Sequence, residues 1–335
     1  MEITTVDRGD DALVAQLYDV CRSSDAVSRV NQFDYTPEEY AANLRWSFPG
    51  EHDVLLAARD GGTVLGYAQV WFPERDNLDK TWFELFVHPE HRRQGVGSAL
   101  VERVERVVRD EGRSLALPEA FVPPGHRDDA PAARFAARHG YEVADTEVVR
   151  SLRLPVDAAV LDRFEASARE AMGEAYRLEV HRGGVPEPLR AGLCAVSNRL
   201  ALDAPSGDIE FEAESMTPDD YQQLLEHERS LQRERLTALA IEVATGDVVA
   251  YTDLVLPHGD PTFVFQWGTL VMPEHRGHRL GMAVKVANLR ALAGLDPARR
   301  TVRTMNAEDN PWMVGINVDL GFEVVEEALM LRKDL

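Results

Sequence analysis

One pattern occurs twice in this chain, at a constant separation of 184 residues. Val87 begins the stretch Val-His-Pro-Glu-His-Arg, and Val271 begins the stretch Val-Met-Pro-Glu-His-Arg. Without any gap, the same separation also superposes glycine, valine, tyrosine, proline and aspartate positions upstream. The period is too long for a solenoid, in which repeats of about 20 to 50 residues stack on one another. The chain is therefore expected to contain two related units, each with its own hydrophobic core.

The predicted elements follow the same order in both halves. Polar helical stretches lead into two strands joined by a tight turn, which is Asp60-Gly-Gly in the first half and Ala244-Thr-Gly-Asp in the second. A third strand, a glycine-bearing loop and a helix with apolar residues three and four apart come next. This order predicts an α/β (α+β) fold with two tandem domains, 1–155 and 156–335. Each domain is expected to be a mixed, mostly antiparallel sheet flanked by helices.

The composition argues against several classes of function. The formal charge of -21 opposes binding to nucleic acid or to a membrane, because a local basic patch would have to overcome the repulsion. The charge is compatible with a cationic acceptor, although acidity also keeps proteins soluble. The first residues do not resemble a leader and no stretch is long enough to span a bilayer, so a cytoplasmic protein is expected. Cys21 and Cys194 are too few for a disulfide framework or a metal cluster, and we expect no metal.

The loop after the third strand of the first half has the residues of an anion-binding site. Gly95 and Gly97 stand where the strand ends and a helix begins, and a helix N-terminus exposes backbone N–H groups that bind anions such as pyrophosphate. Arg92 and Arg93 can add charge-assisted hydrogen bonds. The phosphate-binding loop of ATPases is excluded because no Gly-Lys-Ser/Thr follows, and the dinucleotide fingerprint lacks its third glycine.

These residues resemble the acetyl-CoA signature of the GNAT acetyltransferase superfamily: glutamine or arginine, two residues, glycine, one residue, then glycine or alanine. The order of elements also fits that fold over nearly the whole chain, twice, and implies a tandem member similar in layout to the mycothiol synthases. The resemblance implies that acetyl-CoA is the acyl donor. It assigns to acetyl-CoA binding Leu85, Phe86, Val87, Arg92, Arg93, Gln94, Gly95, Val96, Gly97 and Ser98 in the first half, and Leu270, Val271, Arg276, Gly277, His278, Arg279, Gly281, Met282 and Asn310 in the second.

The resemblance also implies a catalytic base and an oxyanion donor. The main-chain N–H near Val87 would polarise the thioester carbonyl, and a carboxylate would take the proton of the acceptor ammonium. Glu84, on the same strand, is the candidate base; alternatively it is a rim residue that only faces solvent. The tyrosine that often serves this family as general acid is replaced by Ala136 in the first half and by Asn317 in the second. Asn317 is the candidate catalytic residue of the second half.

The second copy of the motif departs from the first. Arg279 stands where the first half has Gly95, and could either crowd pyrophosphate or bind it. Gly268 stands where the first half has Glu84. Polar residues of this half could bind pantetheine amides or an acceptor, or could cap helices and turns, and both interpretations stay open. They are Gln266, Thr269, Thr304, Asn306, Asn310 and Asn317.

Two classes of function are compatible with these observations. In the first, the chain is an enzyme that moves an acetyl group from acetyl-CoA to an amine of a small molecule or peptide, by direct attack on the thioester, in either domain. In the second, it is a sensor or scaffold that binds a CoA ligand with one or both domains inactive. We expect a small-molecule amine as acceptor, for which a cation is compatible with the acidic charge, no nucleic-acid or membrane partner, and a monomer whose halves form an internal pseudo-dimer.

Overall fold

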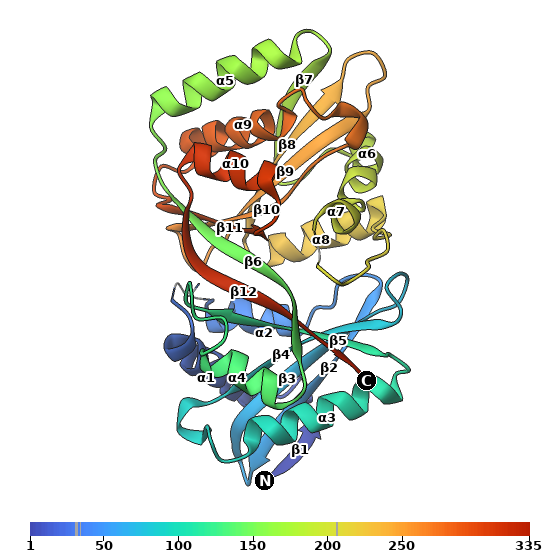
Figure 1. Cartoon of the computed structure of the whole chain (residues 1–335), viewed down its shortest axis with the longest axis vertical. Helices are drawn as coiled ribbons and strands as arrows, with labels where there is room; N and C mark the ends of the chain where they lie inside the picture. Colours follow the sequence, from blue (N-terminus) through green and yellow to red (C-terminus); the bar gives the residue numbers. More distant parts are fainter. Residues whose placement is uncertain (31–32, 34, 206) are drawn as a thin grey trace. The chain divides into compact units, whose positions relative to one another are not determined.

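The computed structural model describes residues 1–30, 33, 35–205 and 207–335 (Figure 1). The chain forms two compact units. Unit 1 comprises Met1–Glu147, Val325–Leu335 and a short segment that ends at Glu210, and unit 2 comprises Val148–Pro205 and Phe211–Val324. Each unit is built from more than one segment of the chain, so a single boundary does not describe them. The boundary after residue 155 stays a prediction about the two halves of the repeat.

The sheet of unit 1 is mixed and mostly antiparallel. Its strands, in chain order, are β1 (Glu2–Thr5), β2 (Glu51–Asp60), β3 (Thr63–Pro73), β4 (Lys80–Val87), β5 (Leu115–Val122), the first part of β6 (Glu142–Arg153) and most of β12 (Glu323–Asp334). They lie in the order β1-β2-β3-β4-β5-β12-β6, with β4 and β5 parallel. Strand β12 lies within the predicted second domain, 156–335, but it pairs antiparallel with β5. The hydrophobic pattern identifies a strand without saying which neighbour it pairs with.

Helices cover both faces of this sheet. They are α1 (Asp11–Ser28), α2 (Pro37–Leu44), α3 (Val96–Asp110) and α4 (Pro131–Arg138), with a 3₁₀ turn, η1 (Pro89–His91). Successive residues of a strand point to opposite faces. In β3, Tyr67 belongs to the core under α1 and α2, and Ala68 belongs to the core under α3. The helix predicted after the glycine loop is therefore confirmed as the one that fills the second face.

Unit 2 repeats this arrangement. Its strands are β7 (Tyr176–Arg182), β8 (Glu234–Glu242), β9 (Val248–Leu256), β10 (Phe263–Val271) and β11 (Thr301–Ala307), in the order β11-β10-β9-β8-β7, with the end of β6 beside β11. Its helices are α5 (Ala158–Met172), α6 (Glu187–Ser197), α7 (Leu200–Asp203), α8 (Pro218–Ser230), α9 (Leu280–Leu295) and α10 (Pro311–Leu320), with η2 (Pro273–His275). Strands β10 and β11 are parallel, like β4 and β5. The predicted fold class, two tandem mixed sheets flanked by helices, is confirmed.

Local signals explain the hairpins and the helix ends. Gly61, at φ +56°, forms the β2–β3 turn, and Gly246, at φ +82°, forms the β8–β9 turn, as tight hairpins require. Thr36 begins α2 with a capping box, and Thr217 begins α8 in the same way. In the described part of the chain, none of the helices is both long and apolar enough to cross a membrane.

Candidate active site

Strands β4 and β5 pair along only part of their length. Their parallel register runs from Lys80 opposite Leu115 to Phe83 opposite Pro118, although both strands continue beyond that point. On its other side β4 stays paired with β3 as far as Val87. The second half of β4 therefore has one edge without a strand partner among the described residues.

Main-chain groups of Leu85 and Val87 lie along this open edge. The N–H of His88 donates to the carbonyl of Leu65 in β3 at 3.0 Å. Backbone groups alternate along a strand, so Leu85 and Val87 direct theirs to the opposite side, toward β5. Phe86 points out of the sheet and stacks on Tyr67 at 5.0 Å between ring centroids. The predicted binding of acetyl-CoA by residues 85–87 stays a prediction.

The open edge leads to the N-terminus of α3. Arg93 and Gly95 both have left-handed backbones, at φ +62° and +87°. The first helical hydrogen bond runs from the N–H of Ala99 to the carbonyl of Gly95 at 3.0 Å, so the N–H groups of residues 96–98 precede the helical ladder. Such groups, together with the helix dipole, suit a pyrophosphate. Gln94 is one of the residues predicted to bind acetyl-CoA. Its side chain donates to the carbonyl of Glu90 at 2.9 Å.

Arg92 holds the end of β4 against α1. Its Nε donates to the carbonyl of Val87 at 3.2 Å, and its Nη2 donates to the hydroxyls of Ser24 and Ser28 at 2.9 and 3.0 Å. Burial lowers the pKa of Arg92, and the negative charge of Asp25 opposes that effect. The guanidinium is thus engaged within unit 1, and its predicted contact with pyrophosphate stays a prediction.

Glu84 lies on the face of β4 that carries Phe86, since residues two apart share a face. Burial, together with the negative charges of Glu119 and Asp25, raises the pKa of the Glu84 carboxyl to about 7, and Arg29 opposes these effects. The side chain nevertheless is exposed to solvent. A carboxyl that protein atoms partly enclose, but that a small molecule can reach, has the properties of a general base near neutral pH.

The loop of unit 2 keeps the backbone of the first loop with the two residue types exchanged. Gly277 has φ +86° where unit 1 has Arg93, and Arg279 has φ +56° where unit 1 has Gly95. Arg276 repeats the role of Arg92, because its Nε donates to the carbonyl of Val271 at 3.3 Å. Its Nη2 lies 3.3 Å from a carboxylate oxygen of Asp203 in α7. The loss of the motif glycine at residue 279 has therefore not changed the course of the loop.

Strand β10 also has an open edge. Its pairing with β11 ends at Phe265 opposite Arg303, and β10 continues to Val271. Leu270 and Met282 are buried in the cores on the two faces of the sheet. The Nδ1 of His278 lies 3.4 Å from the carbonyl of Ala171 at the end of α5. Unit 2 thus repeats the loop backbone and the unpaired strand edge of unit 1 within the described residues.

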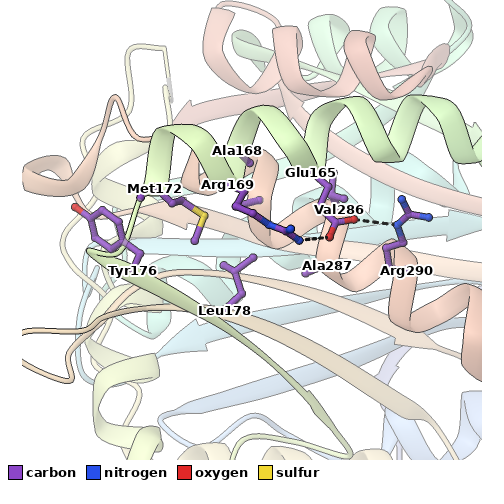
Figure 2. A pocket seen from close by; sticks show the side chains of 11 residues that line it. Glu165, Ala168, Arg169, Met172, Tyr176, Leu178, Val286, Ala287 and Arg290 are labelled. Carbon is purple, nitrogen blue, oxygen red and sulfur yellow. Dashed lines mark hydrogen bonds and ion pairs between the residues drawn. The ribbon is translucent and has the colours of Figure 1, made fainter.

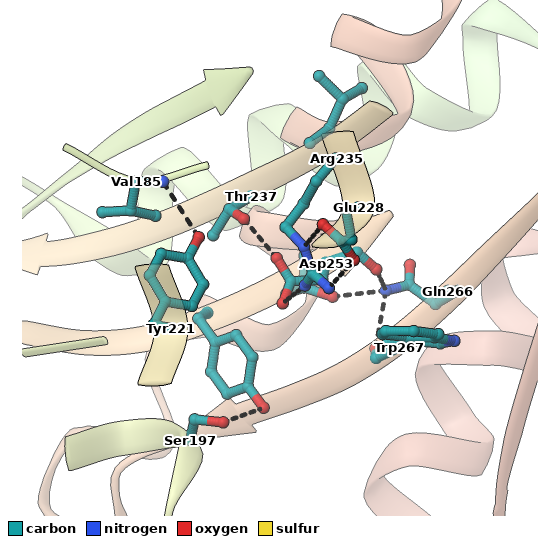
Figure 3. A network of polar contacts seen from close by, with 12 residues as sticks. Val185, Ser197, Tyr221, Glu228, Arg235, Thr237, Asp253, Gln266 and Trp267 are labelled. Carbon is teal, nitrogen blue, oxygen red and sulfur yellow. Dashed lines mark hydrogen bonds and ion pairs between the residues drawn. The ribbon is translucent and has the colours of Figure 1, made fainter. Parts of the chain in front are cut away.

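The face of the unit 2 sheet that packs against α8 differs from the corresponding face of unit 1. A buried ionic network occupies it (Figure 3). Arg235 lies between Glu228, to which its Nε donates at 2.9 Å, and Asp253, to which its Nη1 donates at 2.7 Å. Burial opposes the charge of Arg235, but the two carboxylates raise its pKa above the ordinary value. Gly268 stands in the place of Glu84, and an added Cβ there would collide with the hydroxyl of Tyr251. Unit 2 therefore has no carboxylate at the position of the candidate base.

The structure gives Asn317 and Asn310 structural contacts. Asn317 is fully buried; its Oδ1 accepts from Lys285 Nζ at 2.8 Å, and its Nδ2 donates to Asn306 at 3.0 Å. Arg150 also donates to Asn306, at 3.0 Å. Asn310 caps α10 by accepting from the N–H of residue 313 at 3.1 Å, which agrees with the capping interpretation. With both ends of its amide engaged, Asn317 has lost the exposure that a catalytic acid needs, and its catalytic role stays a prediction.

Sequence reasoning missed Lys285, whose ammonium is fully buried and whose pKa burial lowers to about 7. A lone lysine in the apolar run from Met282 to Ala287 was the available signal. It also missed a pocket of about 340 Å³ between α5, β7 and α9 (Figure 2). Met172, Leu178 and apolar residues of α9 form its walls, and none of the predicted acetyl-CoA residues lines it.

Gly97 and Gly281 let a helix approach each loop closely. An added Cβ would lie 3.1 Å from the ring of Phe135 in unit 1 and 3.2 Å from the Cδ1 of Ile316 in unit 2. A ring yields less readily than the end of an aliphatic chain, so we expect Gly97→Ala to weaken acetyl-CoA binding about tenfold and Gly281→Ala to weaken it less. Calorimetric titration of both variants measures this difference, and equal losses would contradict the explanation.

Comparison with known proteins agrees with this geometry. The model of the acetyltransferase (GNAT) family matches residues 14–141. A mycothiol acetyltransferase of Saccharopolyspora erythraea is 30% identical over 250 residues, which cover 73% of this chain and 74% of that protein. A mycothiol acetyltransferase of Salinispora arenicola is 31% identical over 158 residues, 47% of this chain. The chain spans only 46% of the length of that relative, and 42% of the length of the one from Geodermatophilus obscurus.

Solved structures extend the likeness to the whole chain. A tandem GNAT protein from the clavulanic acid biosynthesis pathway is 25% identical, with a TM-score of 0.79 over 99% of this chain and 98% of that one. A GCN5-related N-acetyltransferase from Sphaerobacter thermophilus, 18% identical with a TM-score of 0.63 over 99% of this chain and 95% of that one, shares the fold. The relative from Saccharopolyspora erythraea, taken with the two open strand pairs and the repeated loop, shows that the chain belongs to the GNAT acetyltransferase family, in its tandem form.

Proposed function

We propose that this protein transfers an acetyl group from acetyl-CoA to the amine of a small molecule, and that the transfer takes place in unit 1. The observation that carries the proposal is the open edge of β4, which runs from Glu84 to the N-terminus of α3. Along this edge lie a partly enclosed carboxyl and main-chain N–H groups without a strand partner among the described residues, and the edge leads to a helix N-terminus suited to an anion. Acetyl-CoA is the acyl donor that the family implies.

Each part of this edge has a chemical task. The N–H groups at the start of α3 hold the pyrophosphate, and the main chain of Leu85 and Val87 binds the pantetheine arm. The N–H of Val87 stabilises the oxyanion that forms when the amine attacks the thioester. Glu84 takes the ammonium proton beforehand. The family's tyrosine is absent at Ala136, but a thiolate leaves readily near neutral pH without a strong acid.

Unit 2 is proposed to bind acetyl-CoA without transferring its acetyl group. Its loop has the backbone of a competent anion site, but Gly268 replaces the base, and Arg235 with its two carboxylates occupies the face on which an acceptor would lie. Under this proposal, the alternative of an inactive scaffold that binds a CoA ligand applies to unit 2 alone.

The acceptor is proposed to be a small cationic amine. The relatives named mycothiol acetyltransferase favour a small-molecule acceptor, and the carboxyls of Glu84, Glu119 and Asp25 favour a positive charge in unit 1. A cytoplasmic location and a monomeric state remain predictions of the sequence.

Acetyl-CoA titration of two matched variants tests which unit is active. Gly95→Asp and Arg279→Asp place a carboxylate at the same left-handed position of each loop, where it repels pyrophosphate. We expect the native chain to bind two equivalents, each variant to bind one, and only Gly95→Asp to lose amine-dependent release of free thiol. The opposite pattern, with thiol release lost in Arg279→Asp, would place catalysis in unit 2.

A further inference from the structure

Two carboxylates face each other where β4 and β5 separate. The last paired residues are Phe83 and Pro118, so the parallel register places Glu84 opposite Glu119 at the first positions beyond the ladder. Neighbouring strands are about 4.8 Å apart before they diverge. Both side chains are exposed to solvent, and no hydrogen bond to either carboxylate is found within the described residues.

Both carboxylates belong to the face of the sheet that carries α1. Glu84 shares its face with Phe86, which stacks on Tyr67 in the core under α1 and α2. Glu119 shares its face with Phe121, and the guanidinium of Arg29, at the end of α1, lies 3.5 Å from the centre of the Phe121 ring. The two acids are thus neighbours on one face, and both border the open edge of β4.

Burial raises the pKa of both acids, and the positive charge beside this pair, Arg29, opposes that rise but is itself paired with another carboxylate. Arg29 donates to both carboxylate oxygens of Glu326 in β12, at 2.9 to 3.2 Å, and Glu326 also accepts from the N–H of Val30 at 2.9 Å. Arg22 and Arg92 act on Asp25, while the other titratable groups near the pair are acidic or neutral. They are Cys21 and Asp25 of α1, Tyr40 of α2 and Tyr67 of β3, with Glu147 of β6 beside Glu119.

We propose that Glu119 is the second carboxylate of the acceptor subsite: with Glu84 it holds the ammonium group of the acceptor, and its charge sets the proton affinity of Glu84. The inference rests on the proposed transfer reaction in unit 1. A cation between two carboxylates is bound by both, whereas a neutral amine is not. Glu119 is therefore a positioning residue that selects a charged acceptor and tunes the base.

The reaction balances with one proton released to solvent. Glu84 takes a proton from the ammonium group, and the lone pair of the free amine forms the C–N bond with the thioester carbon. The C–S bond then breaks, and its electron pair leaves with sulfur. The nitrogen loses a second proton as the amide forms, and that proton goes to the thiolate. Glu84 later returns its own proton to water, which restores the carboxylate pair.

Glu119→Gln keeps the shape of the side chain and removes its charge. Loss of a negative neighbour stabilises the ionised form of Glu84, so its pKa falls. We expect Glu84 to titrate about 0.5 to 1 pH unit lower in this variant, and the rising limb of the kcat/KM profile to move by the same amount. Millimolar hexylammonium, an acceptor-like probe, should lower the pKa of Glu84 in the native chain and lower it less in the variant.

Carboxyl ¹³C NMR of the full chain, with the Glu84 signal identified by its loss in Glu84→Gln, measures these titrations. Glu102→Gln, an exposed change on α3, is the matched control and should leave the titration of Glu84 unchanged. An unmoved Glu84 titration in Glu119→Gln would overturn the proposal. If the native chain releases no thiol with any amine, the transfer reaction fails while a shifted titration still demonstrates the carboxylate pair, so the two failures are distinguishable.

Discussion

Replacing Glu84 with glutamine is expected to lower kcat for acetyl transfer about 100-fold or more, the usual contribution of a general base. Acetyl-CoA binding should be unchanged, because the main-chain groups and the α3 N-terminus remain. Burial raises the pKa of Glu84 to about 7, so the native kcat/KM should rise with pH up to that value and then level off. In the variant this limb should disappear. Stopped assays of free thiol at pH values on both sides of about 7 measure this limb.

We expect the loss of activity in Glu84→Gln to occur without unfolding, and measurements of the unfolding temperature test this. A carboxyl whose pKa is higher in the folded than in the unfolded chain destabilises the fold as pH rises from its ordinary range to the folded value. Glu84→Gln should therefore unfold at a temperature no lower than the native chain at pH 8. Glu102→Gln provides the control for loss of an exposed acid elsewhere in unit 1. A variant with full activity and an unchanged pH profile would remove Glu84 from the role of base.

The second large effect is expected at Arg235 in unit 2. Only 3% of this residue is exposed, and Arg235→Met would leave Glu228 and Asp253 as buried carboxylates without a counter-charge. Removing one member of a buried ionic network costs about 3 to 5 kcal/mol, which for a unit of this size lowers the unfolding temperature by roughly 10 °C. The loss should shrink as pH falls, because burial raises the pKa of Asp253 and protonation of this carboxyl removes a charge that lacks a partner. Differential scanning calorimetry measures both effects.

Two comparisons isolate the cause. Adding Glu228→Gln and Asp253→Asn to Arg235→Met removes the stranded charges and should restore much of the stability. Arg182→Met breaks the surface pair with Glu234, whose ions are 2.8 Å apart, and should change the unfolding temperature little. If Arg235→Met behaved like Arg182→Met, the network would not be what holds this face of unit 2 together.

Much of the fold could be predicted from local sequence. The turn Asp60-Gly-Gly and the glycine at residue 246 specify hairpins because they need left-handed backbones, and those turns are found. The three-and-four spacing of apolar residues after each loop predicts α3 and α9. The repeat identified two copies of one loop, and the structure shows the same backbone in both, with Arg93 and Gly95 matched by Gly277 and Arg279.

Partners that lie far apart in sequence could not be predicted in this way. Arg92 contacts Ser24 of α1, and Asn317 is buried beside Lys285; the roles predicted for both toward a ligand stay predictions. A side chain's partner depends on which elements pack together, and composition and period do not encode that.

Turns, periodicities and the repeated loop belong to the sequence itself, because each depends on residues only a few positions apart. Three features depend on the tertiary structure: the pairing of β12 with β5, the meeting of Glu84 with Glu119, and the closing of the unit 2 face by Arg235. Each arises from a register between distant segments, where burial of side chains on both segments selects one alignment among many. The chemistry that separates the two halves of this repeat therefore lies partly in a local exchange, Glu84 for Gly268, and partly in long-range register.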